Sequence, residues 1–165
     1  MWRDKLKSLT LVEVLVAVSI SVLLLGVSIP MFSKNTKSQN LANEADTISA
    51  FYQRARNFAF HPERVDVDGY KVVGENCIIN KCDQLVLYAM SGVAQDEVDI
   101  LLMPNVSIEM PWGASGVEDI MFSVGDGKTN YASTKTLKIY FKGNPGNYLL
   151  ININKAGNVD VAQQT

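Results

Sequence analysis

Hydrophobic residues are concentrated near the start of the chain, where residues 9–32 form an almost unbroken apolar run. The polar side chains in this run are Thr10, Glu13, Ser19, Ser21 and Ser28. As a helix, these 24 residues would be about 36 Å long, which exceeds the roughly 30 Å hydrocarbon core of a bilayer. The pattern therefore predicts a helix that can span a membrane.

A second hydrophobic pattern follows, with apolar residues at intervals of four and three: Leu41, Ala45, Ile48, Tyr52, Ala55 and Ala59. Phe51 and Phe58 widen this stripe, which is typical of an amphipathic helix packed on a soluble domain. The helix should stop at His61-Pro62, because the residue before a proline is biased away from helical geometry. Together the two patterns predict one helix of about fifty residues.

From residue 65 onward the hydrophobic period changes to two and turn residues recur, which predicts antiparallel strands. The expected strands are 70–73, 84–90, 98–103, 106–110, 119–124, 136–141, 148–153 and 159–161. Tight reversals are expected at Asp68-Gly69, Gly125-Asp126-Gly127, 143–146 and 156–158, and exposed loops at 112–116 and 125–133. The predicted fold class is α+β, with a long bent N-terminal helix, transmembrane in its first half, packed on an antiparallel β-sheet domain.

Charge adds an orientation to this picture. The net charge of the 165 residues is -2, and basic residues are too scattered to predict a nucleic-acid surface. The residues before the apolar run carry three basic side chains and one acidic side chain: Arg3, Lys5, Lys7 and Asp4. This excess predicts a cytoplasmic N-terminus, which Lys34 and Lys37 beyond the run weaken but do not reverse. The remainder of the chain is then expected outside the cytoplasmic membrane.

Two simple interpretations compete for the apolar run. A secretory signal peptide fits poorly, because the run is long and its exit, residues 27–31, has no A-x-A-like cleavage site. A plain single-pass anchor fits better, but it leaves Glu13 unexplained. A carboxylate within a bilayer is costly unless it is paired or protonated, so Glu13 implies a partner.

The segment Lys7-Ser8-Leu9-Thr10-Leu11-Val12-Glu13, followed by more apolar residues, resembles the prepilin signature of type IV pilin-like proteins. The resemblance implies that a prepilin peptidase cuts between Ser8 and Leu9 and methylates the new amino terminus at Leu9. Glu13 then becomes the fifth residue of the mature chain, the family's glutamate position, and Pro30 matches the family's helix-kinking proline. This chain has Ser8 where the family usually has glycine, and Leu9 where it has phenylalanine. Losing three basic side chains and one acidic side chain would take the net charge from -2 to -4.

Physical arguments agree with these two assembly residues. The amino group of Leu9 in one subunit could lie against the Glu13 carboxylate of a neighbour and neutralise both within an apolar bundle. The alternative is that Glu13 merely lies at the level of the lipid headgroups. Pro30 lacks an amide donor and clashes with the carbonyl group of Gly26, so it should bend or locally melt the helix there.

The second half of the chain loosely resembles the minor-pilin and pseudopilin group typified by FimT and GspH. The similar segments are 55–59, 69–72, 85–88 and 151–159. The resemblance implies four parts: a leader (1–8), the transmembrane and assembly half of the helix (9–32), its amphipathic half (33–61) and a β-rich domain (62–165).

The function so implied is a structural subunit of a type IV pilus, or of a type II secretion or competence pseudopilus. Its partners would be other pilin or pseudopilin subunits, the prepilin peptidase, an inner-membrane assembly platform and, only in a competence system, nucleic acid. It would be a single-pass inner-membrane protein before it enters a periplasmic or surface filament. The alternative is a membrane-tethered extracytoplasmic binding domain that does not polymerise.

Other candidate chemistry is sparse. Cys77 and Cys82 are expected to face each other across a hairpin and, outside the cytoplasm, to form a disulfide. His61 is expected to complement the dipole at the end of the helix rather than to act in catalysis. Five acidic residues suggest loop calcium sites, but their spacing fits no EF-hand and solvated turns are the simpler interpretation: Asp66, Asp68, Asp96, Glu97 and Asp99. No catalytic residue, metal site or cofactor is predicted, and the chain is not expected to be an enzyme.

Overall fold

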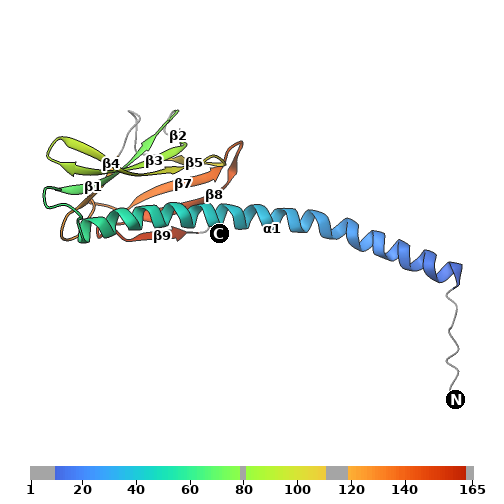
Figure 1. Ribbon diagram of the computed structural model, residues 1–165. Helices are drawn as coiled ribbons and strands as arrows, with labels where there is room; N and C mark the ends of the chain where they lie inside the picture. Colours follow the sequence, from blue (N-terminus) through green and yellow to red (C-terminus); the bar gives the residue numbers. More distant parts are fainter. Residues whose placement is uncertain (1–9, 79–80, 111–118, 163–165) are drawn as a thin grey trace, which may run out of the picture. The chain divides into compact units, whose positions relative to one another are not determined.

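The computed structural model describes residues 10–78, 81–110 and 119–162, except for the side chains of residues 25–35. The chain divides into two compact units, Met1–Gln39 and Asn40–Thr165. Its helix, α1 (Leu11–Phe60), has residues in both units, and the strands all belong to the second (Figure 1).

Local interactions determine where α1 begins and where it ends. At its start the N–H of Val14 donates to the carbonyl oxygen of Thr10 at 3.2 Å, which closes the first turn. At its end the N–H of His61 still donates to the carbonyl oxygen of Asn57 at 3.0 Å, and Pro62 then prevents continuation. The sequence prediction that the helix stops at His61-Pro62 is therefore confirmed.

The strands of the second unit form two antiparallel sheets. The first has the order β4 (Ala94–Leu102), β3 (Gln84–Ser91), β1 (Gly69–Glu75) and β6 (Ile120–Ser123). The second has the order β2 (Lys81–Cys82), β5 (Val106–Glu109), β7 (Lys135–Phe141), β8 (Asn144–Ile153) and β9 (Val159–Ala162). The edges of the sheets are therefore β4 and β6 in one and β2 and β9 in the other.

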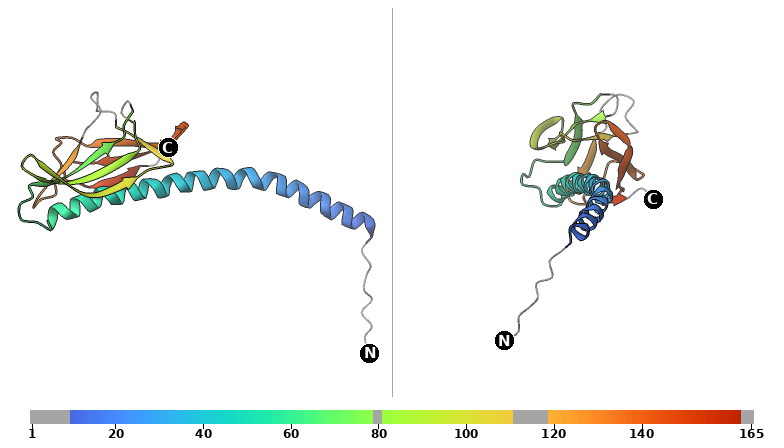
Figure 2. Two further views of the ribbon diagram at one scale, coloured as in Figure 1. Left: turned by 45° about the horizontal axis from the view of Figure 1, so that its top comes forward. Right: turned by 90° about the vertical axis from the view of Figure 1, so that its right-hand side faces the viewer.

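The core lies between these sheets and the amphipathic part of α1, which runs along the strands of its own unit (Figure 2). All six stripe residues that the sequence predicts are at most 1% exposed. They join inward-facing strand residues such as Leu87, Ile108, Ile139 and Ile151 in one hydrophobic cluster. Period 3.6 on the helix and period two on the strands therefore meet in one core, as the sequence predicts.

The structure corrects several details of the predicted strands. Gly69 is already paired with Met90 at the start of β1, so Asp68-Gly69 is not a tight reversal. Phe141 pairs with Asn144, which puts the next reversal at Lys142-Gly143 rather than at 143–146. Strand β4 begins four residues earlier than expected, and the two-residue strand β2 was not predicted. The predicted loop at 112–116 lies outside the described residues.

The reversal predicted at Gly125-Asp126-Gly127 is confirmed. The N–H of Gly127 donates to the carbonyl oxygen of Ser123 at 3.0 Å, and both glycines have positive φ, 93° and 59°. Residues other than glycine rarely adopt this conformation, which explains the two glycines flanking Asp126.

Candidate assembly surface

The first turns of α1 expose apolar side chains on every face. Ten large apolar residues between Leu11 and Leu24 are each between 49% and 80% exposed: Leu11, Val12, Val14, Leu15, Val16, Val18, Ile20, Val22, Leu23 and Leu24. Soluble monomers rarely leave contiguous apolar surfaces of this kind in water, and larger ones mark interaction with proteins or membranes. We call residues 11–24 the apolar segment.

Serine side chains do not interrupt the apolar character of this segment. The hydroxyl of Ser19 donates to the carbonyl oxygen of Leu15, and that of Ser21 to the carbonyl oxygen of Ala17, each at 2.8 Å. Both hydroxyl donors are thus satisfied within the helix, so packing against an apolar neighbour would leave neither of them without a hydrogen-bond partner. The segment is suited to apolar contact around its circumference.

Glu13 has a partner within its own chain. Its Oε2 atom accepts hydrogen bonds from the N–H and from the hydroxyl of Thr10, both at 2.9 Å, and its own N–H donates to the Thr10 hydroxyl at 3.3 Å. This reciprocal arrangement is a capping box, in which the residue before the helix and the one three positions later satisfy each other's backbone donors. The box was not predicted from the sequence, although Thr-x-x-Glu before an apolar run is its recognised signal.

The remaining predicted assembly and processing residues are only partly described. Ser8 and Leu9 lie outside the described residues. Pro30 lies within α1, which is assigned as helix without interruption through Gly26 and Pro30. Of the two alternatives expected at Pro30, local melting does not occur, and a bend stays a prediction. In the part of the chain that the structure describes, no stretch of helix combines the length and apolarity needed to cross a membrane.

Cys77 and Cys82 are joined by a disulfide, as predicted. Cys77 follows β1, an inner strand of the first sheet, and Cys82 belongs to β2, an edge strand of the second, so the bond links the two sheets. Cys82 is 3% exposed and belongs to the hydrophobic core. A methyl group on Gly74 would lie only 2.8 Å from its sulfur atom, which explains the glycine at that point of β1.

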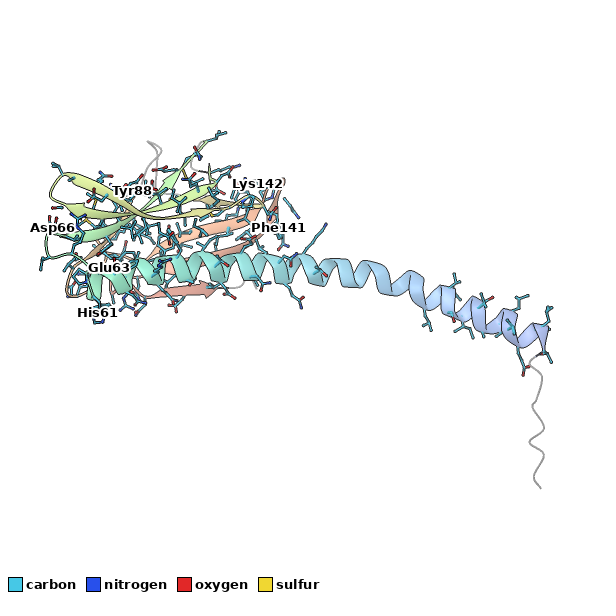
Figure 3. All side chains as sticks on the ribbon, in the orientation of Figure 1. His61, Glu63, Asp66, Tyr88, Phe141 and Lys142 are labelled. Atoms are coloured by element: carbon cyan, nitrogen blue, oxygen red, sulfur yellow. A yellow bond between two sulfur atoms is a disulfide. The ribbon has the colours of Figure 1, made fainter. Side chains whose placement is uncertain are left out.

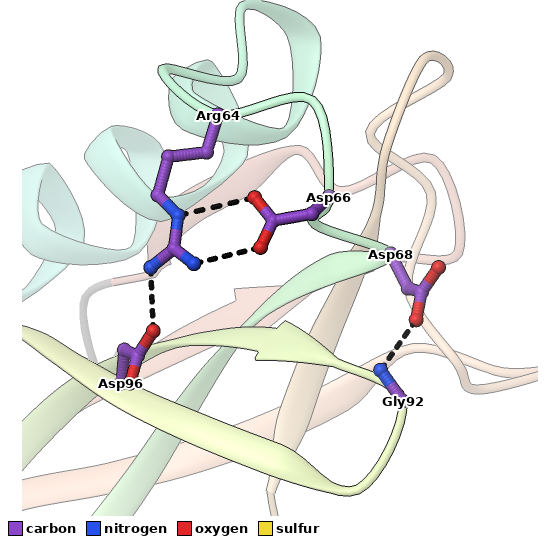
Figure 4. A network of polar contacts seen from close by, with 5 residues as sticks. All are labelled: Arg64, Asp66, Asp68, Gly92 and Asp96. Carbon is purple, nitrogen blue, oxygen red and sulfur yellow. Dashed lines mark hydrogen bonds and ion pairs between the residues drawn. The ribbon is translucent and has the colours of Figure 1, made fainter.

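Four of the five acidic residues that suggested calcium sites, all except Glu97, form ion pairs or hydrogen bonds. Arg64 contacts both carboxylate oxygens of Asp66, at 3.1 and 2.7 Å, and also contacts Asp96 (Figure 4). The Arg64 contact lowers the pKa of Asp66, and Asp68 accepts the N–H of Gly92 at 2.7 Å. No group of three metal-ligating side chains occurs among the described residues.

The structure also places the three acidic residues expected between 96 and 99, and His61. Asp96, Glu97 and Asp99 lie on β4 rather than in turns, and Asp99 accepts a 2.6 Å bond from Arg54 of α1. The prediction of solvated acidic turns was therefore wrong for these three residues. His61 lies directly after α1 with an exposed side chain (Figure 3), and its interaction with the helix dipole stays a prediction.

The fold is similar to that of the type IV minor pilin FimU of Pseudomonas aeruginosa strain PAO1, in two crystal forms. Both comparisons give a TM-score of 0.57 at 16% sequence identity, covering 74% of this chain and 92% of FimU in one form, and 77% and 91% in the other. No protein-family model and no curated protein matches the sequence. The chain therefore has a pilin-like α+β fold, while membership of the FimT and GspH group stays a prediction.

Proposed function

We propose that the chain is a structural subunit of a type IV pilus or of a type II secretion or competence pseudopilus. The observation that carries the proposal is the apolar segment of α1, whose side chains are exposed on all faces and followed by a pilin-like domain. A helix of this kind needs an apolar environment, either lipid or the helices of neighbouring subunits. A filament subunit would meet both environments, first the lipid of the membrane and then the helices of its neighbours.

Processing belongs to the same proposal. A prepilin peptidase would cut between Ser8 and Leu9 and methylate Leu9, leaving Thr10 and Glu13 as the second and fifth residues of the mature chain. Residues 9–32 would hold the protein in the inner membrane before assembly, with the β-domain outside the cytoplasm. An assembly platform and other pilin or pseudopilin subunits would be its partners, and nucleic acid only in a competence system.

The capping box provides a competing explanation for Glu13. If the carboxylate serves only to cap α1, it needs no amine from a neighbour, and a tethered binding domain that never polymerises becomes the better interpretation. The two roles differ in their dependence on charge. A capping box accepts glutamine as well as glutamate, whereas pairing with a buried amine needs the negative charge.

Three substitutions separate these roles. Glu13→Gln keeps a capping oxygen but removes the charge, Thr10→Ala removes the cap but keeps the charge, and Glu63→Gln neutralises an exposed carboxylate beyond the helix as a control. We expect Glu13→Gln to lower recovery of the subunit in sheared filaments by about tenfold or more, because an unpaired buried amine is strongly destabilising. Thr10→Ala should have a much smaller effect, and Glu63→Gln none.

The opposite pattern would count against assembly through Glu13. If Thr10→Ala lowered recovery about tenfold or more while Glu13→Gln assembled normally, capping would be the whole role of Glu13. If wild-type protein were absent from filaments and from the assembly platform, the tethered binding domain would replace the filament subunit. Immunoblots of sheared and membrane fractions, normalised to total protein, measure both outcomes.

A further inference from the structure

A small open pocket lies within the second unit, between the C-terminal part of α1 and strand β9, which lie side by side (Figure 1). Its volume is about 290 Å³, and it is lined by Gln53, Arg56, Asn57, Asn158, Val159 and Asp160. Five of the six lining side chains are polar. Gln53 and Asn57 are exposed, so the pocket opens on the solvent side of the helix.

The side chain of Arg56 is held in a fixed place at this pocket. Its guanidinium lies 5.1 Å from the centre of the Phe60 ring, in a cation–π contact. Two glycines with positive φ make room for its stem. A methyl group on Gly127 would lie 3.2 Å from Cγ of Arg56, and one on Gly157 would lie 3.0 Å from Nε. The arginine is thus preorganised, so a ligand would lose little side-chain entropy on binding.

Among the described residues, Arg56 has no anionic partner. Its Nε atom is buried and has no hydrogen-bond partner, and no ion pair to its guanidinium occurs among the described residues. By contrast, Arg54 contacts Asp99 at 2.6 Å and Arg64 contacts Asp66 at 2.7 Å. Because arginine stays charged and its planar fork matches a carboxylate, a positioned but unpaired guanidinium is a binding group for such an anion.

The other lining groups narrow the choice of ligand. Asp160 would repel a multiply charged anion such as phosphate, but it accepts hydrogen bonds from donors next to a carboxylate. Gln53, Asn57 and Asn158 offer amide donors and acceptors of the kind that pair with a peptide backbone. The pocket therefore suits an acidic side chain on a peptide better than a free inorganic anion.

We infer that this pocket binds an acidic side chain of a neighbouring copy of the chain. This inference rests on the proposed function, because a filament brings the α1 surfaces of neighbours together. The same helix carries suitable side chains in Glu44 and Asp46, neither of which has an ion pair among the described residues. The contact would join β-domains laterally, independently of the apolar segment.

The first experiment tests the chemistry of the pocket alone. Full-length protein in zwitterionic detergent, with arginine side chains labelled with ¹⁵N, is titrated with a blocked aspartate, N-acetyl-aspartate N-methylamide. The asparagine analogue and inorganic phosphate serve as comparison probes. We expect the aspartate probe to shift the Arg56 signals and to saturate them with a dissociation constant on the order of millimolar. Affinity this weak is expected of a single charge-assisted contact. The absence of saturation, or tighter binding of phosphate, would overturn the inference.

Two variants assign the binding to Arg56. Arg56→Lys keeps the charge and the stem but loses the planar fork, so the aspartate probe should bind about tenfold more weakly to a protein that still folds. Arg54→Gln is the matched control, because its guanidinium is already bonded to Asp99 and its loss should leave probe binding unchanged. If Arg56→Lys bound the probe as tightly as wild type, the pocket would not act through Arg56 and the inference would be wrong.

A second experiment tests the neighbouring copy as the source of the carboxylate. We expect Arg56→Lys and the double variant Glu44→Gln, Asp46→Asn each to lower recovery in filaments by about fivefold or more, with cleavage after Ser8 unaffected. Normal recovery of both variants would exclude the neighbouring copy while leaving the proposed function intact. Failure of the proposed function would appear differently, as loss of wild-type cleavage or of wild-type filaments.

Discussion

Replacing Tyr52 by phenylalanine should stabilise the protein. Tyr52 lies on the buried face of α1 and is 0% exposed, and its hydroxyl has no hydrogen-bond partner among the described residues. Burial of the hydroxyl raises the pKa of Tyr52 far above its ordinary value. Phenylalanine would keep the ring in the core and remove only the unpaired polar group.

The expected gain follows from two opposing contributions. An unsatisfied buried donor costs about 1–3 kcal/mol, which the substitution recovers. The contacts of one oxygen atom are lost, at about 0.1–0.2 kcal/mol for each atom pair, and offset part of that gain. We therefore expect Tyr52→Phe to raise the free energy of unfolding by about 1 kcal/mol.

Urea unfolding of the full-length protein at pH 7, followed by circular dichroism, measures this change. Tyr131→Phe is the matched control, because the Tyr131 hydroxyl donates to the carbonyl oxygen of Asp119 at 2.9 Å and its loss should lower the free energy of unfolding. Tyr140 offers a replicate, since it is 4% exposed and its hydroxyl also has no described partner. A clear destabilisation by Tyr52→Phe would refute the reasoning, because it would require a partner for the hydroxyl.

Three further changes have defined outcomes. The hydrogen bond to Glu75 raises the pKa of Tyr88 from 10.0 to about 12, so folding stability should fall as pH rises from about 10 to 12, and Tyr88→Phe should flatten that part of a pH series of melting curves. Replacing both Cys77 and Cys82 by alanine should lower the free energy of unfolding by about 2 kcal/mol and make urea unfolding insensitive to reductant. If reductant affected the wild type no more than this variant, the disulfide would be excluded. Ile48→Ala, at a fully buried position, should cost about 2–5 kcal/mol in the same assay, and a cost below 1 kcal/mol would contradict the placement of the stripe in the core.

The buried elements are those that the sequence predicts best. The stripe from Leu41 to Ala59 has a period that matches its burial. In the strands that contain Leu85, Ile108 and Ile139, the period of two matches the residues that join the hydrophobic core. The end of the helix is also predictable, because a single proline fixes it. For these elements the local pattern and the tertiary environment agree, which is why a pattern suffices.

The details that the sequence did not predict depend on long-range pairing. The first half of β4 carries Asp96 and Glu97 and has no alternating apolar face. It is an exposed edge strand, so its geometry comes from pairing with β3 and not from a pattern in its own sequence. Likewise β2 is only two residues long and exists because it pairs with β5. The partition of strands into two sheets is equally non-local, so a single sequence gives no direct signal for it.

The candidate site divides in the same way. The apolar segment, Glu13 and the disulfide are visible in the sequence, because each depends on residue type and short spacing. The capping box is also visible there, although the resemblance to prepilins points to a partner for Glu13 in a neighbouring subunit rather than to Thr10. The pocket at Arg56 could not be predicted, because Gly127, Gly157 and β9 meet the helix only in the folded domain.

Intact-mass measurement with N-terminal sequencing, applied to protein isolated from native membranes, tests the central claim most directly. In the proposed filament, the amino group of Leu9 pairs with Glu13 of a neighbouring subunit. That amino group exists only after the leader has been removed. We predict a polypeptide that begins at Leu9, in the membrane fraction as well as in any filaments recovered from the cell surface. A mature protein that still begins at Met1 would contradict the account.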